Sequence, residues 1–397
     1  MGTIIIHNDK IRDPKAFAAV CPFGALTVTE EGKVELNAAC RSCKLCVKRA
    51  TAGEATYEED APIKAEEGYS GVAVYADLSE GRLHPVTEEL IGKGRELADK
   101  CHQPLYCLVI GQATEQVVAR LRRFPLDGIY VFDAEPLAVY RAEPYVAAFE
   151  AFIRRVRPAS VLVGATVIGR QLAPRVAARF GTGLTADCTV LDMEEDGSLV
   201  QIRPAFGGNI MAQIACPARR PQMATVRYKI MQALPAADRE GDMPVVRMAL
   251  PSEAMASGVT VRSVSPKERV RSIEQAERIV AIGRGVSSPK DREAAEAFAR
   301  AIGAELACTR PLVEQGQMEA RRQIGLSGRT VRPKLIVTLG ISGAVQFAAG
   351  MQSAECIIAV NRDPDAPIFQ IAHYGVVGDV SEVLPLLLEK IEGRNRP

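Results

Sequence analysis

Four cysteines near the N-terminus constrain this chain more than any other feature of its sequence. Cys40, Cys43 and Cys46 are each separated by two residues, and Cys21, which precedes a proline, lies upstream. A run of three cysteines at this spacing supplies three thiolates to a cubane iron–sulfur cluster, and a distant Cys-Pro supplies the fourth. No second triplet precedes Cys21, and the position that a second cluster would need after the run is Ala50. The sequence therefore predicts one [4Fe–4S] cluster rather than two.

A structural zinc site is the alternative, because four thiolates also satisfy tetrahedral Zn²⁺. Zinc ribbons pair their ligands in two separate knuckles, whereas three successive cysteines with two residues between them suit the corner of a cubane. We therefore expect a small ferredoxin-like α+β domain over residues 1–65. The remaining cysteines lie in apolar or strand-like surroundings and are interpreted as small core residues, namely Cys101, Cys107, Cys188, Cys216, Cys308 and Cys356.

Composition limits the rest of the chain. With 397 residues, 47% of them hydrophobic and 24% charged, the chain can form two or three globular domains with cores of their own. A net charge of +1 gives no reason to expect a nucleic-acid partner. The sequence has no secretory signal and no apolar run long enough for a membrane span, so we expect a cytoplasmic protein without membrane insertion.

After an acidic linker that ends near Gly68, apolar runs rich in β-branched residues alternate with helical segments. This alternation is typical of βαβ units around a parallel sheet. It predicts a first Rossmann-like domain over residues 68–262, and a stretch rich in Pro, Gly and Ser between Pro235 and Pro266 is interpreted as an interdomain crossover. The expected strands are 72–75, 105–110, 129–132 and 161–163, with helices over 115–123 and 144–157.

The same alternation continues in residues 266–397 and predicts a second Rossmann-like domain, with strands over 278–282, 335–339, 357–360 and 375–377. Three of these strands end in a residue suited to a tight turn, namely Gly283, Gly340 and Asn361. The carboxyl ends of parallel strands meet at one edge of the sheet, which is where ligands bind. A further loop of small residues, 325–329, can bring backbone N–H groups close to a phosphate or a ribityl chain. Together these turns favour a cofactor site.

Three longer motifs stand in the last part of the chain: Gly340-Ile341-Ser342-Gly343-Ala344-Val345-Gln346, the run 361–369 and Tyr374-Gly375-Val376-Val377-Gly378-Asp379. They resemble the C-terminal FAD domain of the α subunit of electron-transferring flavoproteins. The resemblance extends upstream through 283–285, 309–311 and 325–328, and through 164–175, 183–187 and 203–209 of the preceding domain. It covers roughly residues 68–390. The N-terminal extension resembles the fused form of this subunit in anaerobic, electron-bifurcating or confurcating flavoproteins.

The resemblance implies a role for each residue of these motifs. It places Arg284 at the isoalloxazine ring, where its permanent charge would stabilise electron density on the reduced ring. Thr309 and Arg310 would lie near the polar edge of the flavin, and the Ser327 hydroxyl would face N5, although Thr309 and Ser327 could instead cap local backbone. The other implied contacts are Gln323, Ile324, Gly325 and Leu326 to the ring and ribityl chain, Ser342, Gly343, Ala344 and Gln346 at the start of a helix that would hold the pyrophosphate, and Asn361 and Asp379 to the ribityl-adenosine half. Val345, Phe347 and Val380 are further implied cofactor-binding residues, and Phe347 would face the pyrimidine end of the flavin.

Two positions depart from the common family pattern. Leu326 stands where many relatives have Gln, which removes an amide that could donate to the ring. Phe347 stands where many have His, and a phenyl ring cannot donate a hydrogen bond at all. These departures affect the expected one-electron chemistry of the FAD rather than its binding. Asn361 and Asp379 also have an alternative interpretation as turn or cap residues.

The resemblance implies a redox subunit rather than a stand-alone enzyme. Its FAD would exchange electrons with a dehydrogenase flavin, of acyl-CoA or lactate type, and the cluster would be a port for ferredoxin. A β subunit that binds FAD or AMP and reaches NADH is the implied partner, and the domain over 68–262 would be its main contact surface. Two alternatives remain at this point: a conventional carrier with a structural metal module, and a nucleotide-binding regulator without flavin.

Overall fold

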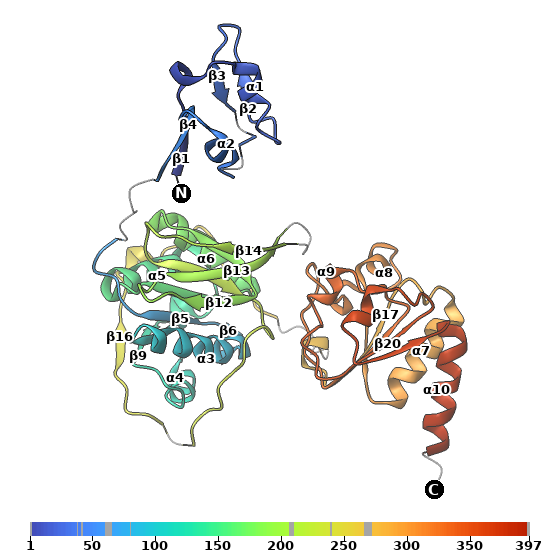
Figure 1. Cartoon of the computed structure of the whole chain (residues 1–397). Helices are drawn as coiled ribbons and strands as arrows, with labels where there is room; N and C mark the ends of the chain where they lie inside the picture. The colour runs from blue at the N-terminus through green and yellow to red at the C-terminus, as the bar shows by residue number, and fades with distance from the viewer. Residues whose placement is uncertain are drawn as a thin grey trace. The chain divides into compact units, whose positions relative to one another are not determined.

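The structure is a computed structural model that describes residues 2–37, 39–40, 43–59, 66–79, 81–205, 210–238, 240–265 and 272–394. Contacts divide the chain into two compact units, residues 1–65 and 66–397. The second unit contains two large sheets, of seven and of five strands, in which every strand pair is parallel (Figure 1). The predicted α/β fold class with two Rossmann-like sheets is confirmed.

The N-terminal unit is a small α+β structure. Its two sheets are antiparallel pairs, β1 with β4 and β2 with β3. Asp13 begins the first helix by accepting hydrogen bonds from the N–H groups of Lys15 and Ala16, with Pro14 in the first turn. That this unit is ferredoxin-like in detail stays a prediction. Its elements are β1 (Gly2–Ile6), η1 (Asn8–Lys10), α1 (Pro14–Ala18), β2 (Leu26–Val28), β3 (Val34–Leu36), α2 (Leu45–Arg49) and β4 (Ala55–Glu59).

The seven-stranded sheet has the order β11-β15-β10-β5-β8-β9-β16. Helices α3 and α4 cover one face and α5 and α6 the other (Figure 1). Its elements are β5 (Val72–Ala76), α3 (Pro85–Lys100), β8 (Leu105–Gly111), α4 (Glu115–Leu121), β9 (Gly128–Asp133), η2 (Glu135–Leu137), α5 (Ala142–Val156), β10 (Ser160–Gly164), α6 (Val167–Phe180), β11 (Leu184–Cys188), β15 (Gln222–Val226) and β16 (Val245–Met248).

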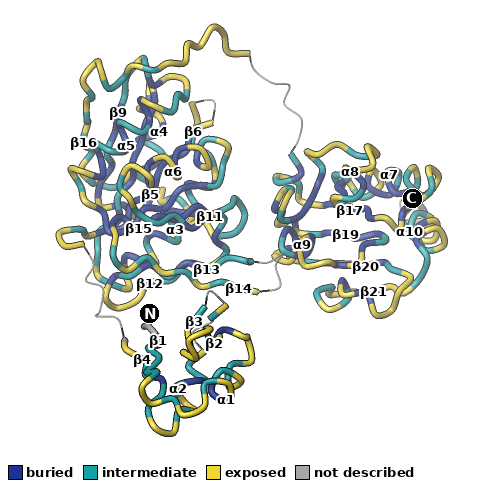
Figure 2. Tube along the Cα trace, turned by 90° about the horizontal axis from the view of Figure 1, so that it is seen from above, coloured by how far each residue is buried: buried dark blue, intermediate teal, exposed yellow. Residues whose placement is uncertain are grey.

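Strand β5 explains why the sequence of this sheet is so apolar. Val72 and Val74 pack into the cluster beneath α3, while Ala73 and Tyr75 pack into the cluster beneath α5 and α6. Because side chains alternate between faces and both faces are covered, every residue of the strand must be apolar. Figure 2 shows buried residues running along the strands of both large sheets. All eight strands expected for the two sheets are present near their predicted bounds.

Smaller elements complete the region before residue 266. They are the hairpin β6 (Leu78–Ser79) and β7 (Arg82–Leu83), the antiparallel sheet of β12 (Val190–Met193), β13 (Leu199–Ala205) and β14 (Ile210–Ile214), and the helical turn η4 (Ser252–Met255). The stretch after Pro235, interpreted as a crossover, differs from expectation because it supplies β16 to the edge of the seven-stranded sheet. Val245 there pairs with Ile129 of β9, and Pro244 is tolerated because it precedes the strand.

The five-stranded sheet has the order β18-β17-β19-β20-β21. One face packs against α7 and α10, and the opposite face packs against loop segments that include Ile324, Val331 and Ile368. Its elements are η5 (Ile273–Gln275), β17 (Arg278–Ile282), α7 (Pro289–Ala301), β18 (Glu305–Cys308), α8 (Arg310–Glu314), η6 (Ala320–Arg322), β19 (Leu335–Leu339), α9 (Val345–Ala348), β20 (Ile357–Asn361), η7 (Pro367–Gln370), β21 (Tyr374–Val377) and α10 (Val380–Arg394). Among the residues that the structure describes, no helix combines the length and apolar character needed to span a bilayer.

Candidate functional site

The strand order of the C-terminal sheet creates a topological switch point. The chain leaves β17 and enters β18 on one side, then returns to β19 on the other side of β17. Connections from adjacent strands therefore diverge, and a crevice opens at their carboxyl ends. The turns beginning at Gly283 and Gly340 follow β17 and β19 directly, so both lie at this crevice.

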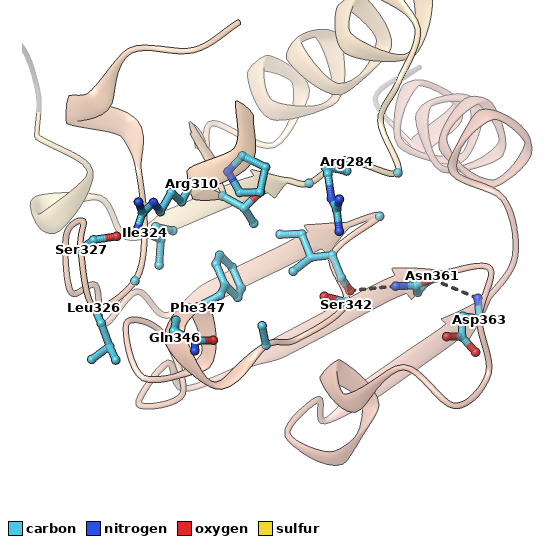
Figure 3. A pocket seen from close by; sticks show the side chains of 18 of the residues that line it. Arg284, Arg310, Ile324, Leu326, Ser327, Ser342, Gln346, Phe347, Asn361 and Asp363 are labelled. Carbon is cyan, nitrogen blue, oxygen red and sulfur yellow. Dashed lines mark hydrogen bonds between the residues drawn. The ribbon is translucent and has the colours of Figure 1, made fainter. Parts of the chain in front are cut away.

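A cavity of about 870 Å³ lies at the switch point (Figure 3). Twelve of the seventeen predicted cofactor residues line it: Arg284, Thr309, Arg310, Ile324, Gly325, Leu326, Ser327, Ser342, Ala344, Gln346, Phe347 and Asn361. The other lining residues are Gly283, Gly285, Pro311, Gly340, Ile341, Arg362 and Asp363. Residues from five separate segments of the sequence thus meet in one hollow.

The lining is cationic. Arg284, Arg310 and Arg362 contribute guanidinium groups, and Asp363 is the single acidic residue among the lining residues named above. Arg310 also pairs with Glu314 at 2.8 Å, which leaves it partly neutralised. Figure 3 shows Arg284 projecting towards the turn that carries Ser342. Such a lining suits a ligand with phosphate groups.

Arg362 and Asp363 line the cavity but were not among the predicted site residues. The signal that could have found them is their position, because they directly follow Asn361 at the carboxyl end of β20. Asn361 itself bridges two turns: its amide donates to the carbonyl oxygen of Ile341 at 2.8 Å, and its side-chain oxygen accepts from the N–H of Asp363 at 3.0 Å. It is therefore a turn residue that also lines the cavity.

Ser327 and Gln323 were both expected to contact the flavin, but only Ser327 lines the cavity. Gln323 is 7% exposed, does not line the cavity, and donates from Nε2 to the Ser327 hydroxyl oxygen at 2.8 Å. Ser327 lines the cavity, and a hydroxyl that accepts one bond still has its own proton to donate. The geometry makes Gln323 a support beneath the loop and leaves Ser327 able to donate into the cavity.

The segment around α9 contributes several lining residues, among them Ser342, Gln346 and Phe347 (Figure 3). Helix α9 spans only Val345–Ala348, and Ala344 at its N-cap lines the cavity. Gly343 is not a lining residue, but its φ of +85° and the 2.3 Å that would separate a Cβ from the Ile368 nitrogen admit only glycine. Gly343 therefore shapes the turn, while Val345 lies outside the lining.

Asp379 and Val380 do not reach the cavity lining. The Asp379 carboxylate accepts a bond of 2.9 Å from the N–H of Ser381 and one of 2.8 Å from its hydroxyl, at the start of α10. These hydrogen bonds lower the pKa of Asp379. Val380 is 4% exposed and packs in the core. The cap interpretation thus describes Asp379, and contact with an adenosine moiety stays a prediction for both residues.

The surroundings of the four N-terminal cysteines determine whether their thiols could bind a metal. Burial would raise the pKa of Cys21, but backbone N–H groups from Phe23 to Leu26 lower it, with Ala25 donating to Sγ at 3.4 Å. Burial and the nearby charges of Cys40 and Cys43 raise the pKa of Cys46, which is 7% exposed. Three of the thiols are thus close enough to interact.

Backbone N–H donors aimed at sulfur suit a thiolate that binds metal. Within the described ranges, however, no three His, Cys, Asp or Glu side chains are arranged to hold a metal ion. The chemistry of the donor set fits a cluster, and the cluster itself stays a prediction.

The C-terminal sheet has a topological switch point, and a cationic cavity lies there. Both features are typical of α/β dinucleotide-binding proteins. Comparison with known proteins identifies the family. Residues 72–253 match the electron transfer flavoprotein domain, and residues 272–352 match the electron transfer flavoprotein FAD-binding domain. The chain belongs to the electron transfer flavoprotein family, and residues 272–352 correspond to that family's FAD-binding domain.

Individual relatives agree with this assignment. The chain is 52% identical to the lactate dehydrogenase (NAD(+),ferredoxin) subunit LctC of Acetobacterium woodii, over 99% of this chain and 94% of that protein. It is 40% identical to the electron transfer flavoprotein subunit alpha of Thermoanaerobacterium thermosaccharolyticum, over 82% and 98% of the two chains. It is 42% identical to protein FixB of Clostridium saccharobutylicum, over 81% and 96%.

Proposed function

We propose that this chain is the α subunit of an electron-transferring flavoprotein that works in flavin-based electron bifurcation or confurcation. Its FAD exchanges electrons with a partner dehydrogenase, and one [4Fe–4S] cluster on the N-terminal unit connects the flavoprotein to ferredoxin. The observation that carries this proposal is the joining of a four-cysteine unit and an FAD-binding domain in one chain.

The extent of the matches supports a functional role for the N-terminal unit. The relative whose name includes ferredoxin matches over 394 residues, whereas the two others match over 325 and 321. The difference is about the length of the N-terminal unit. By the name of LctC, a lactate dehydrogenase is the first candidate for the partner enzyme, ahead of an acyl-CoA dehydrogenase.

FAD supplies the ability to accept and release one or two electrons, and residues of this chain would hold and tune it. We assign the ring end of the cavity to Arg284, Thr309, Arg310 and the loop 324–327. The turn 342–346 would contact the pyrophosphate, and Phe347 would face the pyrimidine end of the flavin ring. Asn361 would hold the ribityl-adenosine half. Glycine at the turns lets backbone amides approach the ligand, and a fixed cation offsets charge that arrives on the ring.

A β subunit that binds FAD or AMP and reaches NADH would complete the protein, with residues 68–262 as its main contact surface. The test is co-expression of both subunits with the candidate lactate dehydrogenase under anaerobic conditions, followed by an assay of lactate oxidation with NAD⁺ and reduced ferredoxin together. Activity that requires both electron carriers supports the proposal. Full activity with a single carrier would identify a conventional electron carrier instead, and a purified protein without flavin would exclude both.

The cluster has its own test. In the variant Cys43→Ala, iron and acid-labile sulfide should fall by at least half, while FAD content stays at one per chain because the flavin domain lies in the other compact unit. The matched control is Cys101→Ala. In the unaltered protein the Cys101 thiol belongs to the other compact unit and donates to the carbonyl oxygen of Leu97 in helix α3. Zinc in place of iron and sulfide in the unaltered protein would favour the structural metal module.

A further inference from the structure

Arg227 connects the end of the seven-stranded sheet to the flavin cavity. It directly follows β15, and its side chain is only 16% exposed. One nitrogen of its guanidinium, Nη2, donates to two acceptors: Oδ2 of Asp187 at 2.7 Å and the backbone carbonyl oxygen of Leu326 at 2.6 Å. Leu326 lines the flavin cavity (Figure 3), whereas Arg227 is not among the lining residues.

Asp187 holds Arg227 in this orientation. Its backbone has a φ of +57°, unusual for a residue other than glycine, and its N–H donates to the Thr225 hydroxyl at 3.0 Å. Burial would raise the pKa of Asp187, but the hydrogen bond and charge of Arg227, with a contribution from Arg170, lower it. The carboxylate is therefore ionised at neutral pH and fixed in place.

The loop that receives Arg227 is also held by bonds within it: the N–H of Gly325 donates to the Arg329 carbonyl oxygen at 3.1 Å, and that of Gly328 donates to the Gly325 carbonyl oxygen at 3.0 Å. The N–H of Leu326 donates to the carbonyl oxygen of Gln346 at 2.8 Å, so Arg227 and Gln346 hold the two polar groups of the same residue. Gly325 precedes it with a φ of +134°, and a Cβ there would lie 2.7 Å from the Gln346 carbonyl oxygen, so the backbones of the loop and of α9 lie close together. Arg227 adds to the bonds within the loop a charged donor from outside it, at the carbonyl of a residue that lines the cavity.

We propose that Arg227, oriented by Asp187, is a positioning residue of the flavin site. By holding the Leu326 carbonyl, it fixes the loop 325–328 in the conformation that receives the flavin, and it makes the affinity for FAD depend on a residue outside the cavity. The inference rests on the assignment of this cavity to FAD. A hydrogen bond from a charged donor is among the stronger contacts available to a backbone carbonyl.

Arg170 provides the matched control. It also contacts Asp187, at 3.2 and 3.4 Å, but it is half-exposed and makes no contact with Leu326 among the hydrogen bonds of the described residues. Loss of either arginine weakens the ion pairing of Asp187. Only loss of Arg227 releases the loop.

The experiment compares Arg227→Gln and Arg170→Gln in the full-length chain with FAD. We expect the dissociation constant for FAD to rise about tenfold in Arg227→Gln and to change less than twofold in Arg170→Gln. The visible circular dichroism of bound FAD, which reports the surroundings of the ring, should change only in Arg227→Gln. Arg227→Lys keeps the charge and should give an intermediate dissociation constant.

The possible outcomes distinguish a failure of this inference from a failure of the assignment of the cavity to FAD. If the unaltered protein binds no FAD, the flavin assignment fails. If it binds FAD and Arg227→Gln retains both the affinity and the dichroism spectrum, Arg227 does not position the loop. Equal loss of affinity in both variants would also overturn the proposal, because it would trace the effect to the stability of the Asp187 region. Melting temperatures of the flavin-free proteins identify any variant that fails to fold.

Discussion

The backbone N–H of Gly285 donates a hydrogen bond of 3.0 Å to the carbonyl oxygen of Gly340. This bond joins the turns after two adjacent strands, β17 and β19, at the switch point of the FAD-binding domain. A Cβ built on Gly340 would lie 2.6 Å from the Gly285 Cα. The two turns can therefore approach this closely only because both residues are glycine. The floor of the cavity is therefore backbone packed against backbone.

The first prediction is that Gly340→Ala disrupts the cavity. Gly340 has a φ of +61°, and alanine there adds a steric clash with Gly285 to the cost of a left-handed conformation. We expect a loss of roughly 2–4 kcal/mol in stability and weak or absent FAD binding. Thermal unfolding followed by circular dichroism, with FAD titration, measures both effects.

The control for Gly340→Ala is Gly303→Ala. Gly303 lies in the same domain with a nearly equal φ of +64°, but the nearest atom to its Cβ would be a side-chain nitrogen of Arg278 at 3.7 Å. It should lose about 1 kcal/mol and bind FAD normally. Equal effects of the two substitutions would mean that backbone conformation alone, and not the contact between the turns, accounts for the loss.

The second prediction concerns Arg284, which lines the cavity and projects into it (Figure 3). If it lies at the ring, Arg284→Ala removes a fixed positive charge from the site where electrons arrive. A loss of roughly 1–2 kcal/mol corresponds to a fall of roughly 40–90 mV in a one-electron potential of FAD. Redox titration with reference dyes measures the potential.

Two further variants show whether charge is the cause. Arg284→Lys keeps the charge and should recover most of the potential. Arg300→Ala removes an exposed cation from helix α7, where it does not line the cavity, and should leave the potential unchanged. An unchanged potential in Arg284→Ala, with FAD fully bound, would place this arginine away from the ring.

Buried parallel strands were predictable because both of their faces must be apolar. Val72–Ala76 is continuous in apolar residues for that reason, and β17 and β19 are nearly so, with exposed Arg278 at the start of β17 and Thr338 within β19. The three-stranded sheet β12-β13-β14 was not predicted. Its strand β13 contains Gln201, Arg203 and Pro204, which break the apolar pattern. The strand is stabilised by pairing with β12 and β14, and the residues within the strand do not indicate that pairing.

The candidate site likewise contains some features that the local sequence predicts and others that depend on residues far apart in the chain. Glycine and asparagine after strands identified the turns, because the sheet brings the carboxyl ends of its strands together. Asp379 carries the same type of signal, but it caps α10, and a sequence cannot distinguish a cap from a ligand contact. The link from Arg227 to Leu326 joins residues far apart in sequence, so no local pattern contained it.

The last prediction concerns Glu89, a buried acid on helix α3 that is 6% exposed. Both carboxylate oxygens accept from the N–H of Lys229, at 3.1 and 2.9 Å. Burial raises the pKa of Glu89 from 4.5 to about 7, and the N–H and charge of Lys229 only partly offset it. The folded state therefore holds this proton more tightly than the unfolded state does.

The sign of the pH dependence follows from that difference. Between pH 4.5 and about 7 the folded state binds more protons, so stability falls as the pH rises through this window. The loss is on the order of 2–3 kcal/mol. Glu89→Gln is neutral at every pH and keeps an oxygen for the Lys229 N–H, so the variant should be more stable than the unaltered protein at pH 8 and nearly equal to it at pH 5. Thermal unfolding midpoints across this range provide the measurement.

The neighbouring residue supplies the control for Glu89→Gln. Glu88 pairs with Arg120 at 2.8 Å nearer the surface of the same helix, and Glu88→Gln should leave the pH dependence in place. Asp77, whose pKa burial raises to about 6, changes stability in the same direction, but it is present in every variant and cancels in the comparison. If Glu89→Gln retains the full pH dependence of the unaltered protein, the proton is held elsewhere, and Asp77 becomes the next residue to replace.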